Sequence, residues 1–447
     1  MNQYLIIGSG VASISAAEAI RSKDPEAQIK LLSDDRHGYY SRPGLAYYLT
    51  GEVPGDQLYS YPPQAYKLLN AKFLRGHATR ILESDHVVEV DKGIFNIPYD
   101  KLLLAVGSYA LKPVVPGIEL QGVVKLDHLQ DAKHIIALAK KSRKAVVVGG
   151  GITALELAEG LVANRVKVHY ILRGDRYWGN VLDETESKII EQRMKEDRIS
   201  IQYHAELAEI LGKNGKVVGI QLVSGEQIKC DIVAVAIGIK PRLELATASG
   251  ITVDRGILTD EYMQTNLQDI YAAGDVAQSL DTASGKRVLD TLWDPAREQG
   301  WTAGLNMAGV KTPYRKSPAF NVTRLAGLTT TIIGQVGGGQ DSDIYGIARG
   351  DSETWRDIPD AIVAQNGFNV NRLRLMVGEK HIMGAVVMGD QSLSTIIQRI
   401  IANQMDITPI RAKLLEQGAT IADVLVKYWT ELTLSNKELA PTSIYQS

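Results

Sequence analysis

The stretch Tyr4-Leu5-Ile6-Ile7-Gly8-Ser9-Gly10-Val11-Ala12-Ser13 consists of an apolar strand, two glycines and the start of an Ala-rich helix. Glycine suits such a turn because the chain bends tightly and its backbone must approach a pyrophosphate closely. The amides at the helix N-terminus can then hold phosphate oxygens. Ser13 stands where a third glycine or an alanine is usual, and it is small enough for close packing of helix on strand. The stretch therefore predicts a dinucleotide-binding unit.

The unit continues into a second strand that ends in two acidic residues. This strand is expected at residues 29–33, and Asp34 and Asp35 follow it. A carboxylate at that place can accept hydrogen bonds from ribose hydroxyls. The candidates for holding a dinucleotide here are Gly8, Gly10, Ser13 and Asp34.

A second copy of the pattern is Ala145-Val146-Val147-Val148-Gly149-Gly150-Gly151-Ile152-Thr153-Ala154. Its second strand, residues 166–172, has no carboxylate at its end, but Arg173 and Arg176 follow. Guanidinium groups match phosphate oxygens, which favours the 2′-phosphate of NADPH, although exposed turn residues explain the arginines equally well. A chain with two such sites usually holds a flavin in one and receives a nicotinamide at the other. The candidates at this second site are Gly149, Gly151, Ala154 and the two arginines.

A third motif is Thr265-Asn266-Leu267-Gln268-Asp269-Ile270-Tyr271-Ala272-Ala273-Gly274-Asp275. It resembles the T-x(4)-[IV]-[YF]-A-x-G-D segment of the pyridine nucleotide–disulfide oxidoreductase superfamily, in which the aspartate binds the ribityl chain of FAD. The resemblance gives that role to Asp275, and Gly274 lets the backbone come close. Residues 105–108 and 236–241, which contain Gly107 and Gly238, resemble the two crossover strands of that superfamily.

The resemblance implies an α/β protein with two Rossmann-like dinucleotide-binding domains, for FAD and NAD(P)H, and a C-terminal α+β domain. The FAD-binding domain is expected at residues 1–111 and 241–312, the NAD(P)H-binding domain at 112–240, and the C-terminal domain at 313–447. Within the C-terminal domain, strands are expected at 332–336, 343–348 and 371–388 with a hairpin at 378–380, and helices at 392–403 and about 409–431.

Residues 40–48 resemble the loop that follows the second strand in the ferredoxin-, rubredoxin- and nitrite-reductase-like branches. The resemblance places Arg42 and Pro43 along the isoalloxazine ring and makes them catalytic candidates. A branch that includes coenzyme A-disulfide reductases has its redox cysteine where this chain has Pro43, so a thiol mechanism is excluded. In several relatives a lysine at the position of Tyr47 pairs with the residue at the position of Glu156. This chain has a tyrosine there, so the usual lysine–glutamate pair is not expected.

Residues 293–300 resemble the final flavin-contacting helix of the family, with Asp294 as the expected N-cap and Pro295 as the first helical residue. The positive end of such a helix would stabilise negative charge on the flavin, although an ordinary capped helix explains the local sequence equally well. Glu156 is a catalytic candidate for steering the nicotinamide, or else a carboxylate favoured by the helix dipole. The remaining cofactor-binding candidates on this helix are Trp293, Ala296 and Gln299. Residues 320–324 resemble a segment that lies beside the flavin in the nitrite-reductase-like branch, which makes Arg324 a further candidate.

The bulk composition is that of a soluble globular protein. The chain has 447 residues, 45% of them hydrophobic, and a formal net charge of −2, which gives no electrostatic reason to expect nucleic acid as a partner. Cys230 is the single cysteine and lies in a buried-strand pattern, so a structural role and no internal disulfide are expected. The scattered histidines predict no metal site. Without a signal-peptide pattern or a membrane-length apolar stretch, a cytoplasmic protein is expected.

These observations predict an FAD-dependent NAD(P)H oxidoreductase in which hydride moves directly from nicotinamide to flavin. The chain then supplies positioning and electrostatics rather than an acid–base group. The expected acceptor is an electron-carrier protein, such as rubredoxin or ferredoxin, or an iron–sulfur partner. The alternatives are direct reduction of a quinone or other small oxidant, and a flavin-holding interaction protein.

The last expected helices carry an apolar face at helical spacing. Such a face predicts either the contact of a homodimer or packing on the chain's own domain. The face consists of Leu414, Leu415, Ile421, Val424, Leu425, Tyr428 and Trp429.

Overall fold

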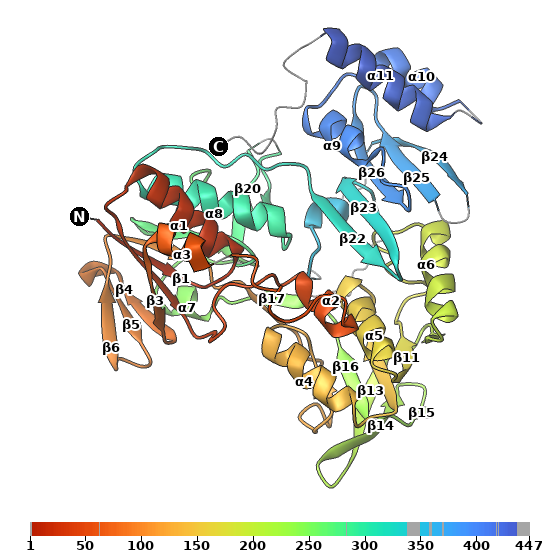
Figure 1. The fold of residues 1–447 in the computed structure, drawn as a ribbon, viewed down its shortest axis with the longest axis horizontal. Helices are drawn as coiled ribbons and strands as arrows, with labels where there is room; N and C mark the ends of the chain where they lie inside the picture. Colours follow the sequence, from red (N-terminus) through yellow and green to blue (C-terminus); the bar gives the residue numbers. More distant parts are fainter. Residues whose placement is uncertain are drawn as a thin grey trace. The chain divides into compact units, whose positions relative to one another are not determined.

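The computed structural model divides the chain into two compact units (Figure 1). It describes residues 2–61, 63–282, 284–337, 349–356, 360–368, 371–416, 418 and 420–435. The first unit consists of residues 1–178, 194–316 and 341–353, and the second of residues 179–193, 317–340 and 354–447. The three domain ranges expected from the sequence stay a prediction.

The first unit contains a five-stranded parallel sheet in the order β19-β7-β1-β2-β3. Its central strand is almost completely buried, as expected for a parallel sheet that is covered on both faces. Its strands are β1 (Gln3–Ile7), β2 (Gln28–Ser33), β3 (Ala71–Arg75), β7 (Lys101–Leu104) and β19 (Ile270–Ala272).

Two helices pack very closely beside this sheet, α1 (Val11–Lys23) and α8 (Trp293–Met307) (Figure 1). A Cβ atom added at Gly300 of α8 would lie 2.2 Å from the Ala12 carbonyl oxygen of α1. Only glycine permits this approach, so the two helices lie backbone to backbone. The packing brings the start of α8 close to the first glycine turn.

The second parallel sheet of this unit has the order β12-β11-β10-β16-β9. It repeats the strand–turn–helix arrangement, with α5 (Ile152–Ala163) following its central strand. Its strands are β9 (Val123–Val124), β10 (Lys144–Val148), β11 (Lys167–Ile171), β12 (Ser200–Gln202) and β16 (Ile232–Val235). The two crossover segments pair as β8 (Ser108–Ala110) with β17 (Ile239–Pro241). The predicted α/β class with two Rossmann-like units is confirmed.

Small antiparallel sheets and short helices complete the first unit. The strands are β4 (Ala78–Leu82), β5 (Val87–Val90), β6 (Phe95–Pro98), β13 (Leu207–Lys213), β14 (Lys216–Leu222), β15 (Gln227–Ile228), β18 (Ile257–Leu258), β20 (Ala277–Leu280) and β21 (Arg287–Val288). The helices are α2 (Gly44–Thr50), α3 (Pro63–Leu69), α4 (Leu129–Ala139) and α7 (Glu244–Ala248), while α6 (Glu184–Glu196) begins in the second unit.

The second unit is built on an antiparallel sheet in the order β22-β23-β26-β25-β24. Its strands are β22 (Phe320–Leu325), β23 (Leu328–Gly334), β24 (Ile362–Phe368), β25 (Asn371–Val377) and β26 (Ile382–Met388). The expected hairpin is present, since the Gly378 amide donates to the His381 carbonyl at 2.9 Å. The strand expected at 343–348 lies outside the described residues.

The single helix expected at about 409–431 is wrong. The chain instead forms α10 (Thr408–Leu414) and α11 (Ile421–Ser435), after α9 (Ser394–Ala402). Gly418 has a φ of +83°, a left-handed conformation that ends a helical path. The helical spacing of apolar residues continues on both sides of Gly418, which is why the sequence pattern did not reveal the break between the two helices.

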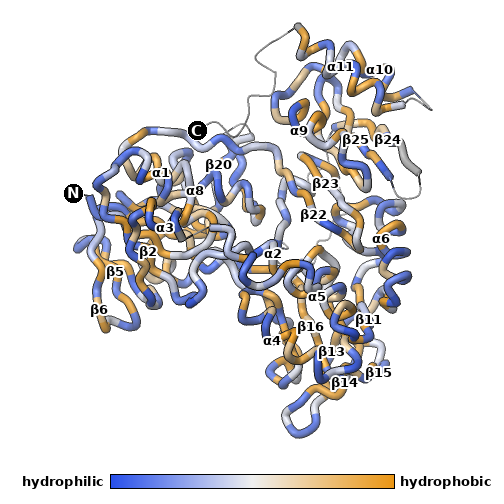
Figure 2. Tube along the Cα trace, in the orientation of Figure 1, coloured by the Kyte–Doolittle hydropathy of each residue, from blue (hydrophilic) through white to orange (hydrophobic). Residues whose placement is uncertain are grey.

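The apolar face of these helices packs on the unit's own core (Figure 2). Leu414, Ile421, Leu425 and Tyr428 are buried there, and Leu415, Val424 and Trp429 pack against them. Packing on the chain's own domain, the second of the two predictions for this face, therefore accounts for it. Among the described helices, none combines the length and the apolar character needed to cross a bilayer.

A buried ion pair anchors residues 179–193 within the second unit. The guanidinium of Arg374 binds both carboxylate oxygens of Glu186, at 2.8 and 2.9 Å, and both side chains are almost completely buried. Arg374 also donates to the carbonyl oxygens of Val181 and Val336 at 2.9 Å. Such a fork of charge-assisted bonds satisfies a cation that would otherwise be costly to bury.

Candidate active site

A cavity of about 430 Å³ lies at the carboxyl ends of the strands of the first sheet. This volume is in the range of about 300–1,000 Å³ typical of ligand sites, and strand carboxyl ends are where open α/β sheets bind ligands. Every strand of the sheet contributes the residues that follow it. The lining includes Gly8, Ser9 and Gly10 after β1, Asp34 and Asp35 after β2, Gly76 and His77 after β3, Val106 and Gly107 after β7, and Gly274 and Asp275 after β19.

The first glycine turn has a geometry that excludes a side chain. Gly8 has a φ of +129°, and a Cβ atom there would lie 2.1 Å from the Ala105 carbonyl oxygen. The same Cβ would lie 3.0 Å from the Ser13 hydroxyl, and Ser13 is fully buried. Ser13 thus packs beneath the turn rather than lining the cavity, whereas Gly10 caps α1 at the cavity wall.

The second glycine turn repeats this geometry. Gly149 has a φ of +150°, and a Cβ atom there would lie 2.1 Å from the Ala236 carbonyl oxygen and 3.0 Å from the Ala154 Cβ. Ala154 therefore takes the place that Ser13 has in the first turn. Gly151 caps α5 as Gly10 caps α1. The two turns thus have the same close contacts and the same glycine at the helix N-cap. Both can therefore present the amides of a helix N-terminus to a phosphate.

Asp275 is held in place by two neighbours. One of its carboxylate oxygens accepts a hydrogen bond from the Ser108 hydroxyl at 2.7 Å. The Gly274 amide before it donates to the side-chain oxygen of Gln299 at 2.9 Å, and Gln299 is fully buried. Gln299 therefore positions the turn from beneath the cavity, while Asp275 faces it.

Charged residues gather along one wall of the cavity, where Arg42, Asp35 and His128 all line it. The nearest His128 and Asp35 side-chain atoms are 3.8 Å apart. Burial and the positive charge of Arg42 lower the pKa of His128. Pro43 does not line the cavity and instead caps α2 from an exposed position.

Asp34 has a partner that sequence reasoning missed. Its carboxylate lies 3.2 Å from the Nδ1 of His77, and both side chains are exposed. Arg242 and Glu244 also line the cavity without having been predicted. The usable signal for His77 was its place directly after a parallel strand, where binding residues collect.

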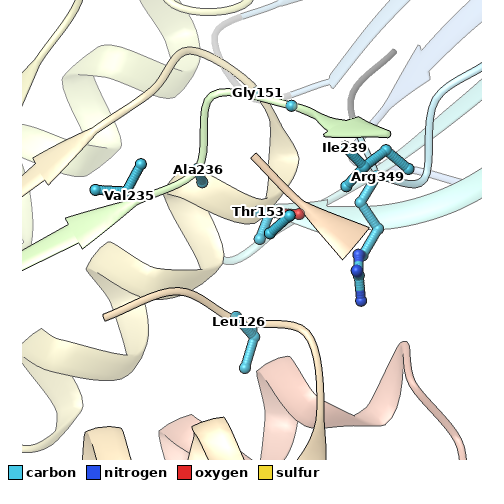
Figure 3. Close-up of a pocket in the computed structure, with 9 residues that line it drawn as sticks. Leu126, Gly151, Thr153, Val235, Ala236, Ile239 and Arg349 are labelled. Atoms are coloured by element: carbon cyan, nitrogen blue, oxygen red, sulfur yellow. The ribbon is translucent and has the colours of Figure 1, made fainter. Parts of the chain in front are cut away.

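Next to the second turn, nine residues line a smaller cavity of about 20 Å³, enough for one water molecule. Gly151, Thr153 and Arg349 are among them (Figure 3), and Gly238 also lines it. Glu156 lies on α5 close by; burial raises the pKa of its carboxyl to about 7, against the opposing positive charge of Arg349. No sequence pattern pointed to Arg349, which lies in the range expected for the C-terminal domain but belongs to the first unit.

The family model of pyridine nucleotide-disulphide oxidoreductases matches residues 2–300. The chain belongs to this family. It is 31% identical to a rubredoxin-NAD(+) reductase of Pseudomonas putida over 71% of this chain and 82% of that protein. It is 27% identical to the epsilon subunit of an NADH-dependent phenylglyoxylate dehydrogenase of Aromatoleum evansii over 90% of this chain and 95% of that one. A ferredoxin reductase of Rhodopseudomonas palustris shares the fold, with a TM-score of 0.83, 22% identity, and coverage of 96% and 100% of the two chains.

Family membership and the two cradles together confirm the predicted chemistry. The chain is an FAD-dependent NAD(P)H oxidoreductase. The larger cavity suits FAD because its glycine turn admits no side chain, the helix after the turn offers its N-terminal amides, and Asp275 in the lining can bind sugar hydroxyls through its carboxylate. The individual roles of the candidate residues stay predictions.

Several candidates of this oxidoreductase lie away from the larger cavity or in other positions than expected. Asp294 as N-cap is wrong, because α8 begins at Trp293 and Leu292, in extended conformation, is its N-cap. Asp294 still lies in the first turn, where a carboxylate suits the helix dipole. Trp293 is 42% exposed and does not line the cavity, whereas Ala296 does. Arg324 lies in β22 of the second unit, and its place beside the flavin stays a prediction.

The two arginines after β11 differ in their surroundings. Arg173 is exposed, whereas Arg176 lies 3.1 Å from the Asp175 carboxylate. Arg173 is therefore the better candidate for a 2′-phosphate. We expect Arg173→Ala to raise the KM for NADPH about tenfold and to leave the KM for NADH unchanged, because a charge-assisted bond contributes about 1.5–3 kcal/mol. Steady-state kinetics with both nucleotides measures this, and equal losses would refute the assignment.

Proposed function

We propose that this chain passes electrons from NAD(P)H through FAD to an electron-carrier protein or an iron–sulfur partner subunit, without a redox-active cysteine. One observation carries the proposal. Cys230 is the single thiol of the chain; it is 3% exposed, and burial raises its pKa to about 12. A thiol with such a pKa forms almost no thiolate at neutral pH, so it cannot relay electrons by disulfide exchange. Electrons must therefore leave the flavin directly.

FAD, when bound, accepts two electrons as hydride and releases them singly or in pairs. The residues of the first cavity orient it. The amides after Gly10 hold the pyrophosphate, and the Asp34–His77 pair binds a ribose. Asp275, fixed by Ser108, binds hydroxyls of the ribityl chain. Arg42, which lines the same cavity, provides positive charge.

The second turn performs the same task for NAD(P)H. The amides after Gly151 hold the pyrophosphate of the nucleotide, and Arg173 selects for the 2′-phosphate. Glu156 lies one turn further along α5 and faces the nicotinamide end. The paired crossover strands β8 and β17 connect the two sheets that carry the two sites, and would bring the nicotinamide site next to the flavin site. No general base is needed for this hydride transfer.

The relatives support a protein acceptor by their names, a rubredoxin-NAD(+) reductase and a subunit of a larger dehydrogenase. Stopped-flow mixing tests the proposal in two steps. The protein is first reduced by NADH or NADPH while the flavin absorbance is followed, and is then mixed with rubredoxin, ferredoxin or a soluble quinone. We expect fast reduction and fast reoxidation by an iron–sulfur carrier. Faster reoxidation by the quinone would favour the small-oxidant alternative, and slow initial reduction would favour the flavin-holding interaction protein.

The homodimer is a separate proposal. The apolar face that suggested it is used by the core of the second unit, so the proposal now depends on other surfaces of the chain. Gel filtration at micromolar concentration tests it, and a monomeric elution volume would end it.

A further inference from the structure

Arg349 is placed at the junction of the two nucleotide sites by a short run of backbone pairing. The Gly350 amide donates to the Thr291 carbonyl at 3.2 Å, and the Thr291 amide donates to the Asp351 carbonyl at 3.1 Å. Thr291 directly precedes the start of α8, whose Ala296 lines the flavin cavity. This pairing therefore fixes Arg349 relative to the flavin site.

The same segment touches the nicotinamide side. A Cβ atom added at Gly350 would lie 3.9 Å from the Ile152 side chain at the start of α5. Of the nine described residues that line the small cavity beside the second turn, Arg349 is the one that carries a charge. Figure 3 shows its side chain extended on the side of Thr153 and Leu126. Arg349 therefore lines the same small cavity as Gly151 and Thr153 at the start of α5.

A fully buried aspartate holds the two terminal nitrogens of this guanidinium, one through its carboxylate and one through its backbone carbonyl. The Nη2 of Arg349 pairs with a carboxylate oxygen of Asp127, and its Nη1 donates to the Asp127 carbonyl at 3.2 Å. Asp127 also accepts the Ala110 amide of the crossover strand β8 at 3.0 Å and pairs with Lys125. The guanidinium is thereby tied to the place where the chain crosses between the two sheets.

One donor of Arg349 is left over. Its Nε is buried and has no hydrogen-bond partner among the described residues. A buried donor without an acceptor is costly, so this atom calls for a partner that the described residues do not supply. Glu156, whose pKa is affected by the charge of Arg349, lies one helical turn beyond Ile152 on α5.

We propose that Arg349 is a positioning residue of the nicotinamide site, held by Asp127, whose Nε–H donates to the carboxamide oxygen of NAD(P)H opposite Glu156. The proposal rests on the proposed function for the placement of the nicotinamide near the second glycine turn and the crossover strands. The carboxamide is assigned rather than the pyrophosphate because the crossover strands adjoin the flavin site, and only the nicotinamide end must reach the flavin. A guanidinium anchored in this way loses little side-chain freedom on binding.

Calorimetric titration of the FAD-loaded protein tests the proposal. The titrant is NAD(P)+, which has the same carboxamide and does not reduce the flavin. We expect Arg349→Met to weaken binding of NAD(P)+ about tenfold to a hundredfold, the range for a lost bond to a charged donor, and to leave the affinity for ADP-ribose unchanged. ADP-ribose contains the pyrophosphate but not the nicotinamide. Equal losses for both ligands, or no loss for either, would overturn the assignment to the nicotinamide end.

Two further variants separate positioning from folding. Arg349→Lys keeps a cation beside Asp127 and should retain the unfolding temperature while still binding NAD(P)+ more weakly, because lysine lacks the fork. Glu353 lies on the same segment as Arg349 and pairs with the exposed Arg255. Arg255→Met removes this partner and should change neither the affinity for the nicotinamide nucleotide nor that for ADP-ribose. A loss in Arg255→Met equal to that in Arg349→Met would mean that only the segment matters, which contradicts the proposal.

The titration of Glu156 separates loss of the cation from loss of packing, because looser packing would lower the pKa of this carboxyl toward its ordinary value. Because the cation opposes the effect of burial on this carboxyl, Arg349→Met should raise the pKa of Glu156 above 7. Failure of the proposed function would give a different result, because NAD(P)H would then not reduce the flavin of the unmodified protein. If NAD(P)H reduces the unmodified protein and the Arg349 variants bind the nucleotide normally, only the role proposed for Arg349 is wrong.

Discussion

Gly8→Ala is expected to yield a colourless protein that does not take up FAD and unfolds at a lower temperature. The new Cβ would lie 2.1 Å from the Ala105 carbonyl oxygen, and the φ of +129° is one that side chains rarely adopt. Backbone strain alone costs about 1–3 kcal/mol at such a position, and relieving the contact must push β1 away from β7. That movement distorts the phosphate cradle. The flavin absorbance of the purified protein and its melting temperature measure both effects.

Gly10→Ala is the matched control for this prediction. A Cβ atom at Gly10 would meet nothing within 4 Å, and Gly10 lines the cavity. Its methyl group should hinder the approach of the pyrophosphate while leaving the stability of the FAD-free protein unchanged. A yellow Gly8→Ala protein that is as stable as the unmodified one would contradict the geometry assigned to the turn.

Glu156→Gln is expected to stabilise the protein at alkaline pH and to remove part of its pH dependence. Burial raises the pKa of this carboxyl from 4.5 to about 7 in the folded chain. The folded state therefore keeps a proton that the unfolded state has released. The resulting stability is complete below pH 4.5 and is lost as the pH rises through about 7. A shift of this size corresponds to up to about 3 kcal/mol, and glutamine has no proton to lose.

Urea unfolding at about pH 5 and about pH 8 measures the difference between the unmodified protein and Glu156→Gln. The variant should gain relative stability at the higher pH. Glu26→Gln, at an exposed turn after α1, serves as the control and should show no such gain. A gain that does not change with pH would mean that the carboxyl is ionised in both states.

Both glycine turns were predictable because their chemistry is local. Gly8 and Gly149 each follow a buried strand and precede a helix, so a run of ten residues contains the whole argument. The Asp275 motif is equally local, and its aspartate faces the predicted cavity. The crossover strands could be predicted from resemblance, and the pairing of β8 with β17 confirmed them.

The residues that sequence reasoning missed come from distant segments. Arg349 reaches the second turn only because residues 350–352 pair with the residues before α8, and no periodicity encodes such a contact. His77 meets Asp34 because β2 and β3 are neighbours in the sheet. The start of α8 was misjudged by two residues because Asp294 and Pro295 suit the first turn as well as they suit a cap.

The Arg374–Glu186 pair has a consequence for any attempt to separate the C-terminal portion of the chain. A fragment that starts at residue 313 would retain the cation and lose its carboxylate, because Glu186 precedes it by sequence. An arginine enclosed by apolar strands without its counter-ion costs several kcal/mol, enough to abolish folding of a small unit. We therefore expect the sheet of the second unit to fold only when residues 179–193, which supply the Glu186 carboxylate, are part of the same chain.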